Sequence, residues 1–343
     1  MQPLDKLTLD KLTVALWATN LAQPLNGIEA WAARVDDRMA EAKAEGAQIL
    51  VMPEYAAEQW MSFAPEGLAV TEEIPWLAAQ APAALEALRP LARKHDMALL
   101  AGTMPVRIER AGQDAEREGA GIQAEREGAR IQAAREGARI QSDAPPFVNR
   151  AHLFLPDGRL IVQDKLCLTP GERDPKAWHL ATGDRVEIVE WRGLRLAALI
   201  CLDVELPALA SLLAPHGLDL LLVPSMTEKL SGYARVFCCA KARAVELQAV
   251  VCAVGCIGTA AAPAGKPRLP NISGAAAYLP CEEVLGHSGI AAELPPSDTA
   301  EGPGPMLIAR DLPLAEVRAL RAGRAEVWPG AWSAAHVTVE ESS

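Results

Sequence analysis

Short apolar segments alternate along this chain with longer amphipathic segments, and this alternation constrains the fold more than any other feature. Residues 12–17, 48–52 and 97–102 are apolar runs of strand length. Between them, residues 26–46 and 74–95 carry apolar side chains at helical spacing. Repeated alternation of strand and helix predicts an α/β fold with a largely buried sheet.

The second half of the chain repeats this pattern. We expect further strands at residues 149–155, 160–163, 194–201, 218–223 and 249–254, and helices at residues 205–214 and 235–247. In the first expected helix, Asn26 is the predicted N-cap and Gly46 marks the predicted end.

Residues 115–141 do not fit the pattern, because they are three near-identical nonapeptides, AEREGAGIQ, AEREGARIQ and AAREGARIQ. Nine residues make two and a half helical turns and an odd step along a strand, so neither geometry collects the three isoleucines on one face. The glycine in each unit also costs a helix about 1 kcal/mol. We interpret the segment as an exposed insertion in a loop, with a small solenoid as the alternative.

The composition is that of an acidic globular protein with a large core. The chain has 343 residues, of which 50% are hydrophobic and 22% charged, and its net charge is −11. This charge argues against a nucleic-acid or anionic-membrane binder. We find no signal peptide and no apolar run long enough to span a membrane. The seven cysteines lie mostly in apolar runs, which predicts reduced thiols and a cytoplasmic location.

Three chemically distinctive residues stand where strand-like runs end. Glu54 and Lys165 each follow such a run closely, and Cys201 ends the run at residues 194–201. Catalytic groups in α/β sheets gather at strand ends. Taken singly, the three have ordinary interpretations as a capping or surface glutamate, a solvated lysine and a core cysteine.

Taken together, the three residues make a consistent catalytic set. A thiol with a pKa of about 8.5 needs a nearby cation or base to become a nucleophile at neutral pH. In this interpretation Lys165 supplies the positive charge and Glu54 transfers the proton. None of the six histidines lies in a Cys–His protease signature.

The order and spacing of these motifs resemble the nitrilase superfamily of carbon–nitrogen hydrolases, whose triad is Glu, Lys and Cys in that order. Glu54 matches the strand-Pro-Glu motif, Lys165 the Lys motif, and Cys201 a Cys-x-Asp-x-x-x-Pro stretch, here CLDVELP. Further matches are Pro224-Ser225, Gly232-Tyr233-Ala234-Arg235, Ala242-Arg243-Ala244-Val245-Glu246 and Asn271-Ile272-Ser273-Gly274-Ala275-Ala276. The resemblance covers about residues 12–335 apart from the repeats, which explain the wide interval between Glu54 and Lys165.

The resemblance implies a four-layer αββα sandwich that forms a homodimer or larger homo-oligomer. The carbon-nitrogen hydrolase domain is then expected at residues 1–305, including the repeat insertion, with a C-terminal extension at residues 306–343. The resemblance implies that the extension packs at a subunit interface, because C-terminal arms cross the dimer seam in this family. Trp328 and Trp332 lie close together, which favours docking over the alternative of a disordered end.

The resemblance also implies a mechanism. The Cys201 thiolate attacks an amide carbonyl, and the Lys165 ammonium and the backbone N–H of Leu202 stabilise the oxyanion. Glu54 carries the proton to the leaving amine and then activates water. Glu172, seven residues after Lys165, matches a second glutamate that orients substrate or lysine, with a polar loop residue as the alternative.

The substrate pocket is less well defined by the sequence. We expect Tyr55, Leu202, Thr227 and Tyr233 to bind substrate, and Trp60 and Trp178 are further candidates for the pocket wall. Core or dimer packing is the alternative for the aromatic residues and Thr227. Leu202-Asp203 follows the nucleophile where true nitrilases usually carry Trp-Glu, which favours amides over nitriles.

The sequence therefore predicts an enzyme that hydrolyses a non-peptide C–N bond in a small linear amide, releasing ammonia or an amine and a carboxylic acid. Two alternatives stay open: an acyltransferase that uses the same thioester, and a catalytically silent interaction protein with the repeats as a binding arm. We expect no metal or other cofactor, because Cys238-Cys239 and Cys252-x-x-x-Cys256 have no histidine partner or CxxC pair.

Overall fold

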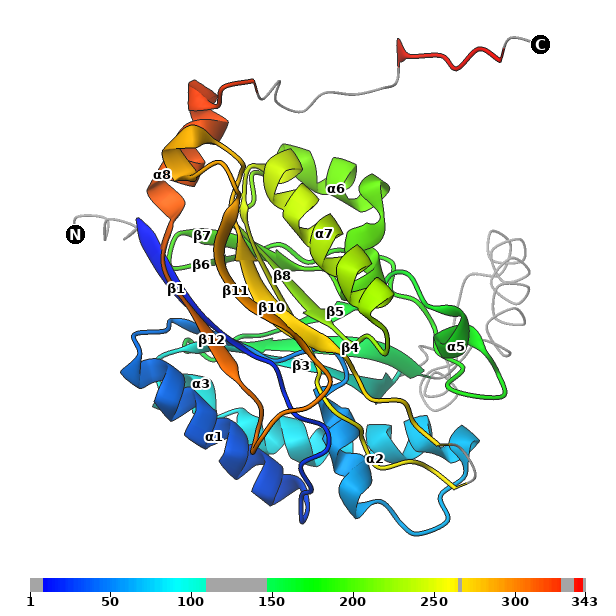
Figure 1. Ribbon diagram of the computed structural model, residues 1–343. Helices are drawn as coiled ribbons and strands as arrows, with labels where there is room; N and C mark the ends of the chain where they lie inside the picture. Colours follow the sequence, from blue (N-terminus) through cyan, green and yellow to red (C-terminus); the bar gives the residue numbers. More distant parts are fainter. Residues whose placement is uncertain (1–8, 109–146, 265–266, 328–335, 342–343) are drawn as a thin grey trace, which may run out of the picture.

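The computed structural model describes residues 9–108, 147–264, 267–327 and 336–341. Two six-stranded sheets stack face to face, and helices cover the outer face of each sheet (Figure 1). The predicted α/β sandwich with four layers is therefore confirmed. The predicted repeat insertion at residues 115–141 lies outside the described residues.

The first sheet has the spatial order β12-β1-β2-β3-β4-β5. Its strands are β1 (Lys11–Trp17), β2 (Ile49–Val51), β3 (Ala98–Arg107), β4 (Phe147–Phe154), β5 (Leu160–Asp164) and β12 (Met306–Pro313). The neighbours β1, β2 and β3 run parallel, and the other pairs are antiparallel.

The second sheet has the same plan, with the order β11-β10-β9-β8-β7-β6 and a parallel trio of β7, β8 and β9. Its strands are β6 (Val189–Trp191), β7 (Leu194–Ala198), β8 (Leu220–Ser225), β9 (Val250–Gly255), β10 (Ser273–Tyr278) and β11 (Ile290–Ser297). Each parallel trio directs the carboxyl ends of its strands to one edge, where functional groups collect.

Helices complete the outer layers. Those on the first sheet are α1 (Ile28–Ala44), α2 (Glu73–Leu88) and α3 (Leu91–Lys94), and those on the second are α6 (Pro207–Leu213) and α7 (Leu230–Leu247) (Figure 1). Two short helices stand apart from these layers, α5 (Pro170–Arg173) and α8 (Leu314–Ala319).

The residues of β1 show why the central strands are apolar throughout. Val14 and Leu16 pack in the core between the two sheets, whereas Ala15 and Trp17 pack in the core between the first sheet and its helices. Side chains alternate between the faces of a strand, so a strand buried on both faces needs apolar residues at every position.

Some predicted boundaries need correction. Helix α1 begins at Ile28 with Gly27, not Asn26, as its N-cap. Residues 74–95 form two helices, and Pro90 is the N-cap of the second. The strand expected to reach residue 201 ends at Ala198.

Strand β12 pairs with β1 in the first sheet. The predicted C-terminal extension, residues 306–343, therefore begins with a strand of the domain's own sheet, and α8 then packs Leu314 and Val317 into the core between the sheets. That later parts of the extension lie at a subunit interface stays a prediction.

Candidate active site

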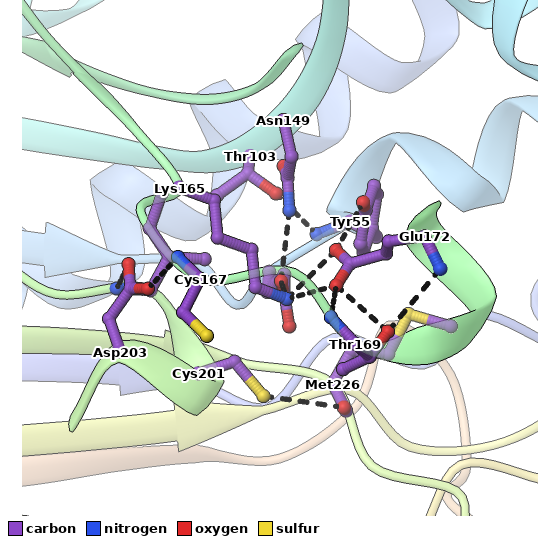
Figure 2. Close-up of polar contacts among 12 residues, drawn as sticks. Tyr55, Thr103, Asn149, Lys165, Cys167, Thr169, Glu172, Cys201, Asp203 and Met226 are labelled. Carbon is purple, nitrogen blue, oxygen red and sulfur yellow. Dashed lines mark hydrogen bonds and ion pairs between the residues drawn. The ribbon is translucent and has the colours of Figure 1, made fainter. Parts of the chain in front are cut away.

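Four residues predicted from the sequence line one cavity of about 730 Å³: Glu54, Lys165, Glu172 and Cys201. Three of them follow β2, β5 and β7, and Glu172 lies in α5. Figure 2 shows the Lys165 and Glu172 side chains directed toward each other, with Cys201 nearby. We call Glu54, Lys165 and Glu172 the catalytic cluster.

Cys201 lies at a sharp turn after β7. Its φ of 49° is left-handed, a conformation that costs a non-glycine residue on the order of 1–3 kcal/mol. Tyr55, which follows Glu54, has a similar φ of 50°. The Cys201 thiol donates to the carbonyl oxygen of Met226 at 3.7 Å (Figure 2). Backbone strain is thus stored at Cys201 itself and at the residue that follows Glu54.

The backbone at Glu54 is held from both sheets. On one side, Gly102 of β3 lies so close that a Cβ there would stand 2.2 Å from the carbonyl oxygen of Pro53. On the other side, the buried Cys256 thiol, just after β9, donates to the carbonyl oxygen of Glu54 at 3.1 Å. Because both neighbours fit closely, the carboxylate starts from a fixed backbone position.

Lys165 joins the two glutamates of the catalytic cluster. Its side chain is 1% exposed, and Nζ donates to Glu54 Oε1 and to both carboxylate oxygens of Glu172, each at 2.8 Å. The side-chain amide of Asn149 donates to the same Glu54 oxygen, Oε1, at 2.9 Å. Two donors therefore hold one oxygen of Glu54, and neither of these bonds uses Oε2.

Glu172 accepts hydrogen bonds on both oxygens. The Tyr55 hydroxyl donates to Oε1 at 2.7 Å, and the backbone N–H and hydroxyl of Thr169 donate to Oε2 at 2.8 and 2.9 Å. Burial favours the neutral acid, but Lys165 and these donors outweigh it and hold the pKa of Glu172 below its usual value. Glu172 therefore stays ionised and orients Lys165.

At Glu54, in contrast to Glu172, the cost of burial outweighs the attraction of Lys165. Burial raises the pKa of Glu54 to about 7, because Lys165 offsets the loss of solvation only in part and the Glu172 charge opposes ionisation. A carboxylate with a pKa near neutrality can both accept and return a proton. Of the two glutamates, Glu54 is the one suited to proton transfer.

Burial and neighbouring charges also shift the pKa values of the Cys201 thiol and the Lys165 ammonium. Burial raises the pKa of Cys201 well above its ordinary value, so the thiol keeps its proton at neutral pH. Burial works against the charge on Lys165, but Glu54 and Glu172 outweigh it and raise the pKa of Lys165. The ammonium remains available to stabilise a developing negative charge.

Asp203 ties the nucleophile turn to the segment after Lys165. Its fully buried carboxylate accepts from the backbone N–H of Ile200 at 3.2 Å, of Leu166 at 3.2 Å and of Cys167 at 2.7 Å. Burial raises the pKa of Asp203 to about 6 despite these donors. The contacts bridge two strand ends that belong to different sheets (Figure 2).

The predicted pocket residues divide into two groups. Tyr55, Leu202 and Thr227 line the cavity, whereas Tyr233 is not among the described residues that line it. Tyr233 packs instead on Phe237, with ring centroids 4.2 Å apart, since side chains four residues apart meet on one helix face. That Tyr233 binds substrate stays a prediction, which the described lining of the cavity does not support.

The two tryptophan candidates also separate. Trp178 lines the cavity and packs on Tyr55, with ring centroids 4.7 Å apart. Trp60 is fully buried in the core under the first sheet, where it meets Trp31 edge to face. Trp178 is therefore part of the pocket wall, and Trp60 belongs to the core.

The structure brings to the site two further groups that the sequence alone did not reveal. Asn149 lies inside β4, and no local motif marks it as a partner of Glu54. Arg268 lines the cavity and pairs with two buried glutamates, Glu58 and Glu73. For the Arg268 pairs, the sequence offered one signal: Glu58 is a charged residue in a segment that is mostly apolar, four residues after Glu54.

The family model for carbon-nitrogen hydrolases matches residues 16–293. The chain belongs to this family. The matched range contains Glu54, Lys165 and Cys201, so the family assignment and the cavity concern the same part of the molecule.

Two curated relatives match parts of the chain. The "Probable hydrolase YhcX" of Bacillus subtilis (strain 168) is 40% identical over 110 residues, which are 32% of this chain and 21% of that protein. An (R)-stereoselective amidase from Pseudomonas sp is 33% identical over 144 residues, 42% of this chain and 48% of that protein. The chain thus matches less than half the length of either relative.

Solved structures of the Nesterenkonia AN1 amidase, from the nitrilase superfamily, share the fold. A cysteine-to-serine mutant covers 91% of this chain and 96% of its own, with 21% identity and a TM-score of 0.58. A glutamate-to-glutamine mutant shows covalent addition of the acetamide moiety of fluoroacetamide at its active-site cysteine. It covers 92% of this chain and 95% of its own, with 22% identity and a TM-score of 0.56.

The described residues contain neither a membrane-spanning helix nor a metal-binding cluster. None of the helices there is long and apolar enough to cross a membrane. No group of three or more His, Cys, Asp or Glu side chains in that part of the chain lies close enough to hold a metal ion.

Proposed function

We propose that this protein hydrolyses the C–N bond of a small linear amide through a thioester on Cys201. One observation carries the proposal: Lys165 and Glu54 form a buried pair with a separation of 2.8 Å on the same cavity as the Cys201 thiol. Membership of the carbon-nitrogen hydrolase family and the fold shared with solved amidases support it.

Acylation begins as the Cys201 sulfur attacks the amide carbonyl carbon and its proton passes to Glu54. The Lys165 ammonium and the backbone N–H of Leu202 offset the charge on the oxyanion. Glu54 then returns the proton to the nitrogen as the C–N bond breaks. Ammonia or an amine leaves, and the acyl group stays on sulfur as a thioester.

Deacylation uses the same groups in reverse. Glu54 takes a proton from a water molecule whose oxygen attacks the thioester carbonyl. The C–S bond breaks, the sulfur of Cys201 recovers the proton, and the carboxylic acid leaves. Glu172 stays ionised throughout and keeps Lys165 in place.

Ammonia release from small amides, dicarboxylate monoamides and nitriles tests the proposal. Wild type is compared with Cys201→Ala and with Cys252→Ala, a control in which another buried thiol, on β9, is removed. We expect ammonia from an amide with wild type and the control, and none with Cys201→Ala. Full activity of Cys201→Ala overturns the proposal, and acyl transfer to an added amine without hydrolysis identifies an acyltransferase.

We also propose that the enzyme acts as a homodimer or larger homo-oligomer. Light scattering on the purified full chain is expected to give at least twice the monomer mass of 36.5 kDa. A monomer at working concentration would contradict this assembly and leave the catalytic proposal standing.

A further inference from the structure

A second buried ionic cluster borders the cavity, and the mechanism above does not use it. Arg268 pairs through Nη1 with Glu58 and through Nη2 with Glu73. The two glutamate side chains are at most 2% exposed, and Arg268 is 12% exposed. We call these three residues the Arg268 cluster.

The members of this cluster differ in what they present to the cavity. Arg268 and Glu73 line it, whereas Glu58 lies behind them. A guanidinium has five N–H donors in a fixed plane, and the two glutamates do not use all of them. The cluster therefore offers a pre-positioned hydrogen-bond donor, whose matching partner is an acceptor on the substrate.

The Arg268 cluster carries little net charge near neutral pH. Burial raises the pKa of Glu58 to about 8, because the attraction of Arg268 offsets the loss of solvation only in part and Glu73 opposes ionisation. With two glutamates against one guanidinium, the cluster has no excess positive charge whether or not Glu58 is protonated. Without a free positive charge, the cluster is a poor site for a substrate carboxylate.

Along the rest of the cavity wall, acidic and basic side chains are equal in number. Outside the catalytic cluster, three acidic and three basic side chains line it: Glu73, Glu205, Glu228, Lys229, Arg235 and Arg268. Arg235 and Glu205 pair with each other at 3.1 Å. The wall therefore has no excess charge that selects an anionic or cationic substrate tail.

The size of the cavity indicates that a substrate reaches beyond the catalytic residues. Its volume of about 730 Å³ lies in the range of sites that enclose drug-sized ligands. An amide with a very short acyl chain fills only part of such a space. Room remains for an acyl chain that extends from Cys201 along the wall.

We propose that Arg268 forms a subsite for an uncharged hydrogen-bond acceptor at the other end of the acyl chain. The inference rests on the proposed function and names its substrate class: linear amides whose acyl chain ends in a neutral carbonyl group. Two glutamates hold the guanidinium in place before substrate binds, so little ordering is needed on binding. Glu73 beside it repels a terminal carboxylate.

Amides of matched length test the assignment. Their far ends carry a methyl group, a dimethylcarboxamide, a carboxylate or an ammonium group, and kcat/KM is measured by ammonia release over a range of chain lengths. With wild type we expect the dimethylcarboxamide to exceed the methyl compound by about tenfold at the best length. The carboxylate and ammonium compounds are expected to fall below it.

Variants of Arg268 separate recognition from structure. Arg268→Lys keeps the charge but loses the planar fork, and Arg268→Gln loses both, so the tenfold preference is expected to shrink in the first and vanish in the second. Arg318→Gln is the control, because Arg318 pairs with the buried Asp219 and does not line the cavity. Its preference is expected to match wild type.

The outcomes distinguish this inference from the proposed function. Equal kcat/KM for the neutral-acceptor and methyl compounds with wild type overturns the subsite and leaves amide hydrolysis intact. An equal fall for all compounds in the Arg268 variants indicates a purely structural cluster and also overturns it. Absence of ammonia from every amide with wild type overturns the proposed function and this assignment with it.

Discussion

Two buried ionic clusters border one cavity, and only one of them contains the glutamate that we propose as the proton acceptor of Cys201. Each holds a cation between two glutamates: Lys165 with Glu54 and Glu172, and Arg268 with Glu58 and Glu73. Buried ion pairs are weak evidence for stability, because desolvation costs offset much of the attraction. The reason for each cluster is better sought in what it does at the cavity.

The clusters differ in what their proton-carrying carboxylate contacts. Burial raises the pKa of Glu54 to about 7 and of Glu58 to about 8. Glu54 lines the same cavity as the Cys201 thiol, whereas the charged partners of Glu58 are Arg268 and Glu73. A perturbed pKa is therefore not enough to mark a catalytic residue here, and the neighbouring nucleophile makes the difference.

Exchange of each carboxylate for an amide tests this difference with the largest expected effect. Glu54→Gln removes the proton acceptor, and we expect kcat to fall by about a thousandfold. Glu58→Gln alters a group that is mostly protonated at neutral pH, and we expect a loss below about tenfold. Steady-state ammonia release on a simple amide measures both, with circular dichroism as the check on folding. Equal losses would contradict the comparison.

The pH dependence of kcat/KM in wild type tests whether burial sets the pKa of Glu54. Glu54 acts as a base only when ionised, so kcat/KM is expected to fall about tenfold per pH unit below a midpoint near 7. Thermal unfolding at each pH separates this loss from acid unfolding. A midpoint near 4.5, the ordinary value for a glutamate, would mean that burial does not control Glu54.

Removal of the Asn149 side chain is expected to shift that profile. Asn149 stabilises ionised Glu54 by donating to Oε1, so Asn149→Ala raises the pKa of Glu54 further and moves the midpoint to higher pH. At neutral pH we expect kcat/KM to fall about tenfold. Asn271→Ala is the control, because that buried asparagine bonds to the Gly258 carbonyl instead. An unchanged midpoint in Asn149→Ala would refute this role.

Asp203 is expected to give the smallest kinetic effect. Asp203→Asn places an amide against three backbone donors, which should cost about 1–3 kcal/mol of unfolding free energy. The turn that carries Cys201 loosens, and we expect kcat to fall only severalfold. Urea unfolding and kcat measure the two effects. A loss as large as that of Glu54→Gln would assign Asp203 a direct part in the chemistry.

That Glu54, Lys165 and Cys201 line one cavity could be predicted from the sequence, because each marks a strand end. Glu54 and Lys165 follow apolar runs, and Cys201 ends another. The local sequence therefore marks each of them as a chemically distinctive residue at the end of a strand. The order of the three then led to the family. The layers of the fold followed from the same runs, since strands such as β1 are apolar on both faces.

Residues whose role depends on pairing between distant segments were not predictable. Asn149 lies within a strand, and only the pairing of β4 with β5 brings it beside Lys165. Arg268 and Glu73 are 195 residues apart in sequence. For Tyr233, a motif match alone does not show which face of its helix meets the cavity.

The most direct test of the account is to capture the acyl group on sulfur. Glu54→Gln is incubated at mildly alkaline pH with an activated ester of the acid that wild type releases. Hydroxide then takes the thiol proton that Glu54 otherwise accepts, the leaving group needs no protonation, and water still lacks its general base. Intact mass and peptide mapping are expected to show one acyl group, labile to hydroxylamine, on Cys201, and none in the variant that also carries Cys201→Ala. Acylation at another residue, or equal acylation without Cys201, would contradict the account.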